Sequence, residues 1–210
     1  MSGLTPVPEA DPSSLRRILI IGTSCAGKST LGSEVGRILG VPHTELDSLH
    51  WGAEWTPVPV DVFRERVATV TAGDRWVIDG NYHAVRDLIW PEATCIVWLD
   101  YSFPLVLWRS VYRSWRRIFR GETCCNGNRE TLRLLLSGDS IIWWVITTYH
   151  ERRREFSEIL PQWAQQGRII RVFRRPSEAT QWLESLPAGT DRTEMSTPRQ
   201  DQGRDESEQR

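Results

Sequence analysis

The sequence predicts an α/β protein of three layers, in which helices cover both faces of a five-stranded parallel sheet. Short apolar runs alternate along the chain with segments of helical periodicity, and several runs are followed by a glycine or an acid. Such runs are buried on both faces, which is typical of parallel strands between helices. Ligands bind at the carboxyl ends of such strands, so the loops that follow them are the first candidates for function.

Each element follows from its own stretch of sequence, taken in chain order. The apolar run 17–21 predicts the first strand, and the pattern at 28–39 predicts the first helix. The run 43–46 predicts the second strand, and a helix is expected at 60–71. The runs 76–78 and 95–99 predict the third and fourth strands, followed by a helix at 103–120. Two more helices are expected at 129–137 and 140–160, before the last strand at 169–173 and the last helix at 178–186.

One domain is predicted, at residues 15–186, between two segments that lack a core pattern. Residues 1–14 contain three prolines and no apolar periodicity, so we expect a disordered leader. Residues 187–210 combine proline, glycine, serine, threonine and mixed charge, without an aromatic side chain. Such a composition buries too little apolar area to offset the entropy lost on ordering, so we expect a disordered tail.

The composition is that of an ordinary soluble globular protein. Of the 210 residues, 40% are hydrophobic and 25% are charged. No apolar run approaches the roughly 18 residues of a membrane span, so no membrane partner is expected. The net charge of −1 does not favour nucleic acid as a partner. The four cysteines are irregularly spaced and no secretion signal is present, so we expect a cytoplasmic protein.

The basic residues contain one exception to a strong bias. The chain has 26 lysine and arginine residues, and Lys28 is the only lysine among them. Position 28 therefore keeps a compact ammonium on a flexible stem where the rest of the chain uses a planar guanidinium. This contrast indicates that the position is chemically constrained.

Lys28 belongs to a segment that matches the phosphate-binding pattern G-x-x-x-x-G-K-[ST], between the first predicted strand and the first predicted helix. The glycines let backbone N–H groups approach phosphate oxygens, and the helix N-terminus adds a partial positive charge. We expect Lys28 to reach the β- and γ-phosphates of ATP and Ser29 to ligate Mg²⁺. The pattern predicts a P-loop NTPase fold. The expected nucleotide-binding residues are Gly22, Thr23, Ser24, Cys25, Ala26, Gly27, Lys28, Ser29 and Thr30.

A second group near the metal is expected at the end of another strand. Asp79 follows the run 76–78, and the Gly80-Asn81 turn after it leaves room for a ligand. We expect Asp79 to hold the water shell of Mg²⁺, with a helix N-cap or a turn residue as the alternative role. Asp100, after the run 95–99, is the competing acid, and for Asp100 the capping or turn role is favoured.

Asp47, after the second run, is the candidate for the acceptor site. Its carboxylate can accept a hydrogen bond from a substrate hydroxyl and act as the general base. His50, Trp51 and Trp55 follow, and they can form an apolar wall on which a ligand stacks. A capping aspartate beside core tryptophans explains the same residues equally well.

The predicted helix at 103–120 carries five arginines along one side, called the arginine face below. At about 100° per residue they form one stripe, and aromatic residues take the opposite side. Stacked cations repel one another unless an anion compensates them, and arginine binds phosphate oxygens bidentately. We therefore expect catalytic roles for Arg109, Arg113 and Arg116, with a solvated face or a nucleic-acid patch as alternatives. The arginine face consists of Arg109, Arg113, Arg116, Arg117 and Arg120.

These segments together resemble the adenylate-kinase-like P-loop proteins, and above all the bacterial topology-modulation proteins. The resemblance spans 15–186 and implies a five-stranded parallel sheet, a short helical lid and ATP-dependent phosphoryl transfer to a small acceptor. The chain differs from adenylate kinases because Asn81-Tyr82-His83 follows Asp79-Gly80 where those enzymes have Phe-Pro-Arg, and because their long lid domain is missing. The matching segments are the P-loop, Glu45-Leu46-Asp47 with Trp51, 76–82, Trp98-Leu99-Asp100 and the arginine helix with 126–130.

The sequence therefore predicts a phosphotransferase that uses ATP and Mg²⁺ and acts on a small molecule or a nucleotide. In this hypothesis Lys28 and the arginines stabilise the transferred group, Ser29 and Asp79 hold Mg²⁺, and Asp47 orients or deprotonates the acceptor. The alternative is a nucleotide-dependent regulator or ATPase that binds a macromolecule such as nucleic acid. An acceptor pocket around Asp47 distinguishes the two, since a regulator does not need one.

Overall fold

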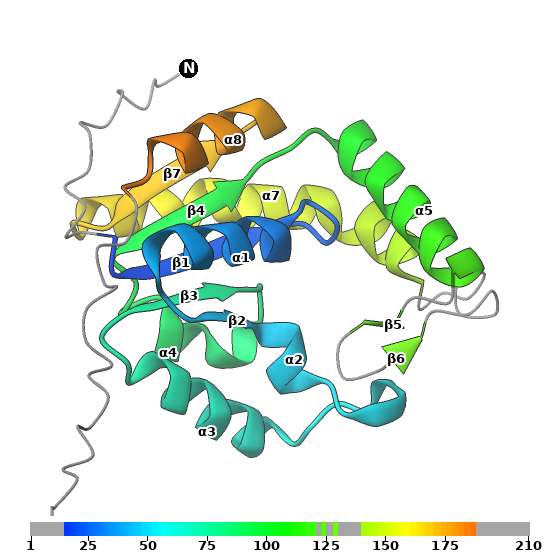
Figure 1. The fold of residues 1–210 in the computed structure, drawn as a ribbon, viewed down its shortest axis with the longest axis horizontal. Coiled ribbons are helices and arrows are strands. Elements are labelled where there is room, and N and C mark those ends of the chain that lie inside the picture. The colour runs from blue at the N-terminus through cyan, green and yellow to red at the C-terminus, as the bar shows by residue number, and fades with distance from the viewer. Residues whose placement is uncertain (1–14, 121–122, 125–127, 130–139, 188–210) are drawn as a thin grey trace, which may run out of the picture.

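The fold is built on a sheet of five parallel strands in the order β2-β3-β1-β4-β7 (Figure 1). The computed structural model describes residues 15–120, 123–124, 128–129 and 140–187. The five predicted strands are confirmed, with small shifts at their ends. Their bounds are β1 (Arg17–Gly22), β2 (His43–Glu45), β3 (Trp76–Asp79), β4 (Cys95–Leu99) and β7 (Ile169–Phe173).

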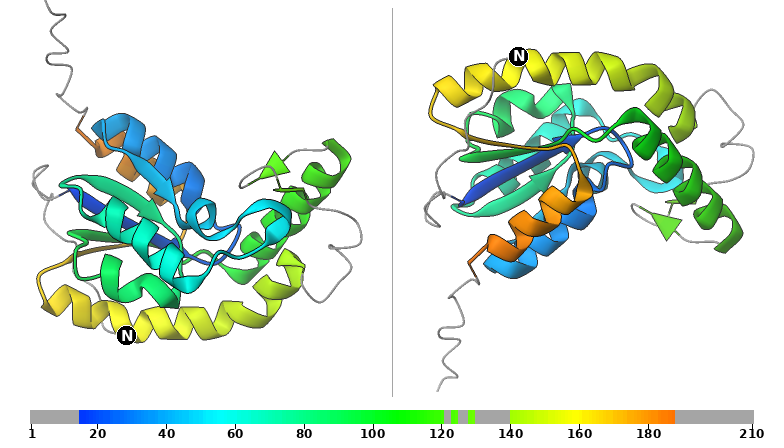
Figure 2. Two further views of the ribbon diagram at one scale, coloured as in Figure 1. Left: turned by 90° about the horizontal axis from the view of Figure 1, so that it is seen from below. Right: turned by 90° about the horizontal axis from the view of Figure 1, so that it is seen from above.

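Helices cover both faces of the sheet, as Figure 2 shows from below and from above. Helices α1 and α8 pack on one face, and α3, α4 and α7 pack on the other. The three-layer α/β fold is therefore confirmed. The helix bounds are α1 (Lys28–Leu39), α2 (Leu46–His50), α3 (Val60–Thr71), α4 (Arg86–Ile89), α5 (Phe103–Arg120), α7 (Ile141–Gln165) and α8 (Pro176–Ser185), with 3₁₀ turns η2 (Ala53–Trp55) and η3 (His83–Val85).

The central strand β1 explains why the sheet is covered on both faces. Ile18 and Ile20 point into the core beneath α1 and α8, whereas Leu19 and Ile21 point into the core beneath α3, α4 and α7. All four side chains are at most 1% exposed. Because successive residues of a strand face opposite sides, an unbroken apolar run requires a helical layer on each side.

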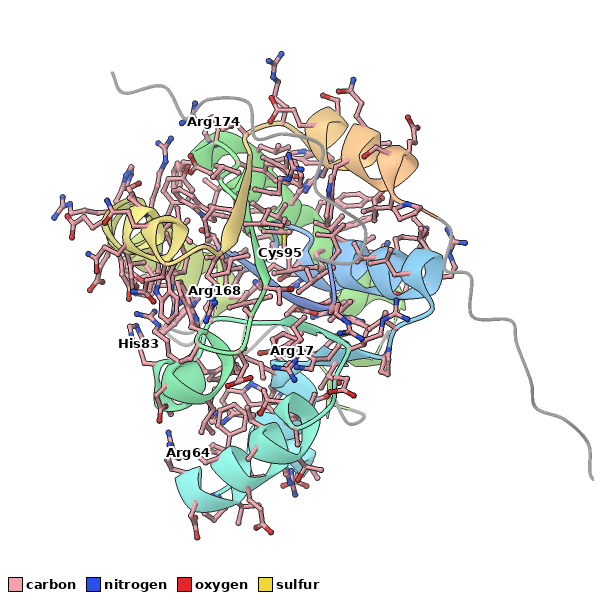
Figure 3. The ribbon with its side chains drawn as sticks, turned by 90° about the vertical axis from the view of Figure 1, so that its left-hand side faces the viewer. Arg17, Arg64, His83, Cys95, Arg168 and Arg174 are labelled. Atoms are coloured by element: carbon pink, nitrogen blue, oxygen red, sulfur yellow. The ribbon has the colours of Figure 1, made fainter. Side chains whose placement is uncertain are left out.

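The strands begin on the side of the sheet that faces the viewer in Figure 3, where Arg17 and Cys95 mark the starts of β1 and β4. Burial raises the pKa of the Cys95 thiol to about 12, so Cys95 is a core residue and not a reactive one. The carboxyl ends of the strands lie on the opposite side, and the P-loop follows the end of β1 there. The predicted site residues therefore share one edge of the sheet.

The segment after α5 contains a pair of strands that the sequence did not predict. Asn128–Arg129 forms β6, which pairs antiparallel with β5 (Thr123–Cys124), so Arg129, the first residue of the helix expected at 129–137, lies in a strand. Asn-Gly, the sequence at positions 126–127, is typical of hairpins and was the local sequence signal for such a pair. The described part of the predicted lid is this pair of short strands. Residues 130–139, the predicted leader at 1–14 and the tail beyond 187 lie outside the described residues.

Helix α7 extends further than its sequence predicts. Its expected end at residue 160 precedes Pro161, which removes a helical hydrogen bond, yet the helix continues to Gln165. The added turn carries Trp163, whose ring lies 5.7 Å from that of Trp90 between centroids. Packing on the core therefore stabilises a turn that local propensity disfavours.

Helix α5 presents three different sides. Ser110 and Ser114 are fully buried and allow close packing of the helix. The arginine face forms a second side, and the aromatic side is exposed, with Trp108 at 62% and Phe119 at 68% exposure. The rings of Trp108 and Tyr112 stack along this exposed side at 5.5 Å. Within the described ranges, no helix combines the length and the apolarity needed to cross a membrane.

Candidate functional site

The P-loop connects β1 to α1 at the carboxyl edge of the sheet. Gly27, the residue before α1, has a φ of 101°, a conformation that side-chain-bearing residues rarely adopt. The Ala26 N–H donates to the carbonyl of Thr23 at 3.1 Å, which closes the loop. The N–H groups of the first turn of α1 have no partners within the helix, so this end of α1 is suited to bind an anion.

Lys28 is the first residue of α1, and its side chain turns back over the loop. Nζ donates a hydrogen bond to the carbonyl of Thr23 at 3.3 Å. Desolvation by burial lowers the pKa of Lys28, the charges of Asp79 and Asp47 act in the opposite direction, and Arg113 adds to the lowering. The fold thus places around one ammonium three side chains that are far from Lys28 in the sequence, those of Asp47, Asp79 and Arg113.

Two carboxylates converge on the Ser29 hydroxyl. Its Oγ lies 3.0 Å from Oε2 of Glu45 and 3.2 Å from Oδ1 of Asp79, which are register partners on β2 and β3. A hydroxyl has one proton and can donate fully to only one of these oxygens. Two carboxylates beside a hydroxyl are the hard oxygen donors that Mg²⁺ prefers, so the residues present fit a Mg²⁺ site.

The protein would supply only part of the Mg²⁺ coordination. Among the described residues, no group of three or more acidic, histidine or cysteine side chains is arranged to hold a metal by itself. This agrees with the usual behaviour of Mg²⁺, which keeps several waters and takes phosphate oxygens as ligands. Ser29 and Asp79 were predicted from the sequence, and the structure adds Glu45 beside them. An acid at the end of β2 was the signal available for Glu45.

Asp100, the competing strand-end acid, is held in an ion pair. Its carboxylate accepts hydrogen bonds from Nε and Nη2 of Arg153 at 2.7 and 3.1 Å, and Nε of Arg174 lies 3.7 Å away. The Asp100 side chain is 4% exposed, so these arginines compensate a buried charge. The geometry favours a structural role for Asp100 and leaves Asp79 as the strand-end acid beside the P-loop.

Asp47 lies on α2 beside a group of rings, called the aromatic cluster below. Oη of Tyr82 donates a hydrogen bond to Oδ1 of Asp47 at 2.7 Å. The ring of His50 lies 4.7, 4.9 and 4.6 Å from the rings of Trp51, Phe63 and Tyr82. Desolvation lowers the pKa of His50, which keeps the ring neutral within the cluster. The predicted wall of rings therefore lies beside Asp47, and Phe63 and Tyr82 complete it.

The arginine face approaches the P-loop with its first two members. Nη1 of Arg109 donates to the carbonyl of Ala26 at 2.8 Å. Arg113, one turn further along α5, lies close enough to lower the pKa of Lys28. Its Nε is buried, and no hydrogen-bond acceptor for it is found in the part of the chain that the structure describes. Arg116 follows nearly one turn later on α5.

Two residues that the sequence did not single out connect the parts of this site. The Asn81 side chain donates through Nδ2 to the carbonyl of Gly22 at 2.5 Å and accepts from the Gly22 N–H at 3.3 Å. Nη1 of Arg152 donates to the Asn81 carbonyl at 3.3 Å, and its guanidinium lies 5.6 Å from the ring of Trp144. The position of Asn81 directly after Asp79-Gly80 was a sequence signal that could have identified it as a site residue. Arg152 had none, because it is 71 residues from Asn81 in the sequence.

Neither a protein-family model nor a curated protein matches the chain. Among solved structures, it is similar to the shikimate kinases of Bacteroides thetaiotaomicron and Aquifex aeolicus, at TM-scores of 0.47 and identities of 15% and 20%. The matches cover 81% of this chain and 96% and 95% of those chains. A gluconokinase from Sinorhizobium meliloti 1021 matches at a TM-score of 0.44 and 17% identity, over 82% of this chain and 89% of that one. These likenesses are weak, so the resemblance to topology-modulation proteins stays a prediction.

Proposed function

We propose that this protein is a kinase that transfers the γ-phosphoryl group of ATP, with Mg²⁺, to a hydroxyl group of a small acceptor. The observation that carries the proposal is the convergence of Lys28, Ser29, Asp47 and Asp79 at one edge of the sheet, with Arg113 beside them. A nucleotide site alone requires only the P-loop and the acid beside Ser29. Asp47 is not needed for a nucleotide site. Its position near the Lys28 ammonium and next to the aromatic cluster suits the binding of a second substrate.

The P-loop and α5 would bind the triphosphate from two sides. Backbone N–H groups at the start of α1 bind phosphate oxygens, and Lys28 contacts the β- and γ-phosphates. Arg113, whose Nε is buried without an acceptor among the described residues, would stabilise the charge that develops on the transferred group. Ser29, Asp79 and Glu45 would hold Mg²⁺, which when bound neutralises phosphate charge and aligns the phosphoryl group.

Asp47 would act on the acceptor. Its carboxylate takes the proton of the acceptor hydroxyl while the oxygen forms a bond to the γ-phosphorus. The bond from that phosphorus to the oxygen bridging it to the β-phosphate breaks, and ADP leaves. The hydrogen bond from Tyr82 holds Oδ1 of Asp47 in place. Because the carboxylate is planar and rigid, this contact also limits the directions in which Oδ2 can point. The aromatic cluster supplies an apolar surface that excludes water from this side.

The test is a screen of small hydroxyl compounds and nucleoside monophosphates for acceptor-dependent ADP formation with MgATP. With the acceptor so found, Asp47→Asn is expected to lower kcat by about 10²–10⁴-fold while nucleotide affinity stays within about twofold, because the proposal places Asp47 against the acceptor hydroxyl and not against the nucleotide. Asp61→Asn, which neutralises an exposed carboxylate on α3, serves as the matched control and should be as active as the parent protein.

Two results would count against the proposal. Full activity of Asp47→Asn with a true acceptor would remove Asp47 from the reaction. ADP formation that no acceptor accelerates, together with salt-sensitive binding of labelled nucleic acid, would favour the alternative of a regulator or ATPase that binds a macromolecule.

A further inference from the structure

Helix α1 contains two glycines, Gly32 and Gly36, at positions where glycine is costly. A glycine in a helix interior is less favourable than alanine by about 1 kcal/mol. A Cβ added at Gly32 would overlap the His43 ring, 2.7 Å from Cδ2, and one at Gly36 would lie 3.2 Å from Cβ of His43 and 2.8 Å from the Val41 carbonyl oxygen. The two glycines thus lower the intrinsic stability of α1, and they leave the space that His43 and Val41 occupy.

The His43 ring uses this space to reach Asp79. Its Nε2 lies 2.8 Å from Oδ2 of Asp79, while Oδ1 of the same carboxylate faces Ser29 at 3.2 Å. The two side chains of this pair are 14% and 5% exposed, so water competes little for either group. Each carboxylate oxygen of Asp79 therefore has its own partner, and the carboxylate cannot rotate without breaking one of the two contacts.

We infer that His43 is a positioning residue, whose Nε2–H fixes the Asp79 carboxylate so that Oδ1 stays directed at the Ser29 hydroxyl and at Mg²⁺. Gly32 is needed for the same contact, because only a residue without a side chain leaves room for the His43 ring. The inference rests on the proposed function, in which Ser29 and Asp79 hold Mg²⁺. A neutral imidazole with its proton on Nε2 is sufficient, so no change of charge is involved.

The contact has a measurable consequence for metal binding. A carboxylate released from its neighbour samples several rotamers, and only some of them present an oxygen to the metal. Residues that orient metal ligands in this way contribute about 10–100-fold to metal affinity. Glu45 approaches Ser29 from the adjacent strand, with Oε2 3.0 Å from Oγ, and no hydrogen bond joins it to His43 among the described residues, so it should keep part of the site in order when His43 is lost.

The experiment compares ATP binding by calorimetry with excess Mg²⁺ and with EDTA, in the absence of an acceptor. We expect His43→Leu, which keeps the volume but removes the N–H, to weaken binding about 10–100-fold with Mg²⁺ and less than about twofold with EDTA. His43→Gln, whose amide can place a donor near the position of Nε2, should recover most of the loss. Gly32→Ala should behave like His43→Leu, because the new methyl displaces the ring.

Controls and contrary results separate this inference from the proposed function. Gly73→Ala, where the added Cβ would lie 3.4 Å from its nearest neighbour, and His150→Leu on α7 should both bind like the parent. One contrary result concerns His43 only. If the parent binds ATP in a Mg²⁺-dependent way but His43→Leu binds like the parent, or is weakened equally with Mg²⁺ and with EDTA, the proposed role of His43 is wrong and the metal site stands. Parental binding that is independent of Mg²⁺ would overturn the metal site and this inference together. If Gly32→Ala does not fold, the two His43 variants decide.

Discussion

Lys28 is subject to two opposing influences in the folded protein. Desolvation lowers the pKa of its ammonium, and the nearby carboxylates of Asp79 and Asp47 only partly offset this effect. A bound triphosphate would add several negative charges beside the same ammonium and would favour its charged form. The pKa of Lys28 should therefore be lower in the free protein than in the nucleotide complex.

This difference predicts proton uptake on nucleotide binding under alkaline conditions. Between the lowered pKa of the free protein and the raised pKa of the complex, Lys28 is neutral before binding and charged after it. Affinity for MgATP should then fall as the pH rises through this window, and remain constant below it. Calorimetry in two buffers of different ionisation enthalpy measures the proton uptake directly. Lys28→Met removes the titrating group, so any uptake that persists in it would contradict this assignment.

At the scale of elements, the two strand-end acids Asp79 and Asp100 have different surroundings and should respond differently to the same substitution. Asp100, directly after β4, is bound by Arg153 of α7, so it connects the sheet to the longest helix of the described residues. We expect Asp100→Asn to lower the free energy of unfolding by about 1.5–3 kcal/mol, since it weakens charged hydrogen bonds of a buried group. Its affinity for MgATP should stay within about twofold. Chemical denaturation and calorimetry measure the two quantities.

Asp79→Asn provides the comparison, with at least about tenfold weaker Mg²⁺-dependent nucleotide binding expected. Arg174→Ala is the control for Asp100, because its side chain is 72% exposed and 3.7 Å from the carboxylate, so its loss should cost less than about 1 kcal/mol. If Asp100→Asn abolished the Mg²⁺ dependence and Asp79→Asn preserved it, the roles of the two acids would be exchanged.

Elements were predictable from the sequence where their signals are local. The P-loop is a continuous motif, and Asp79 stands directly after an apolar strand, so both could be found by reading along the chain. Glu45 lies at the site because it is the register partner of Asp79, and Arg152 does so because α7 returns to the carboxyl ends of the strands. No local sequence pattern predicts either position. The β5-β6 pair was missed because two-residue strands carry too short a pattern to be recognised in a sequence.

On the scale of the whole molecule, the site exists only when the sheet and α5 are assembled. The P-loop follows β1, Asp79 ends β3, Asp47 lies on α2 after β2, and the arginine face comes from α5. An unfolded chain offers a triphosphate none of this geometry. A nucleotide should therefore bind the folded state alone, and the stability of the entire domain should rise with its concentration.

We expect MgATP at about 100 times its Kd to stabilise the protein by about 2.7 kcal/mol. For a chain of this size, that stabilisation corresponds to a rise in Tm of about 5–10 °C. Lys28→Ala should abolish the shift, and Arg37→Ala, which removes an exposed base from the same helix, should retain it. Differential scanning calorimetry provides the measurement. A parental Tm that does not change at millimolar MgATP would contradict the nucleotide site itself.

The single lysine of the chain has a practical consequence. The other 25 of the 26 lysine and arginine residues are arginines, so an acylating reagent specific for amines has one ε-amine as its side-chain target, and that target lies in the P-loop. The lowered pKa of Lys28 increases the fraction of nucleophilic free amine at a given alkaline pH. A bound nucleotide would both cover the amine and restore its proton, so acylation should slow as the loop fills. Mass spectrometry of the P-loop peptide from the parental protein would then measure the fraction of sites that a nucleotide protects, with no engineered label.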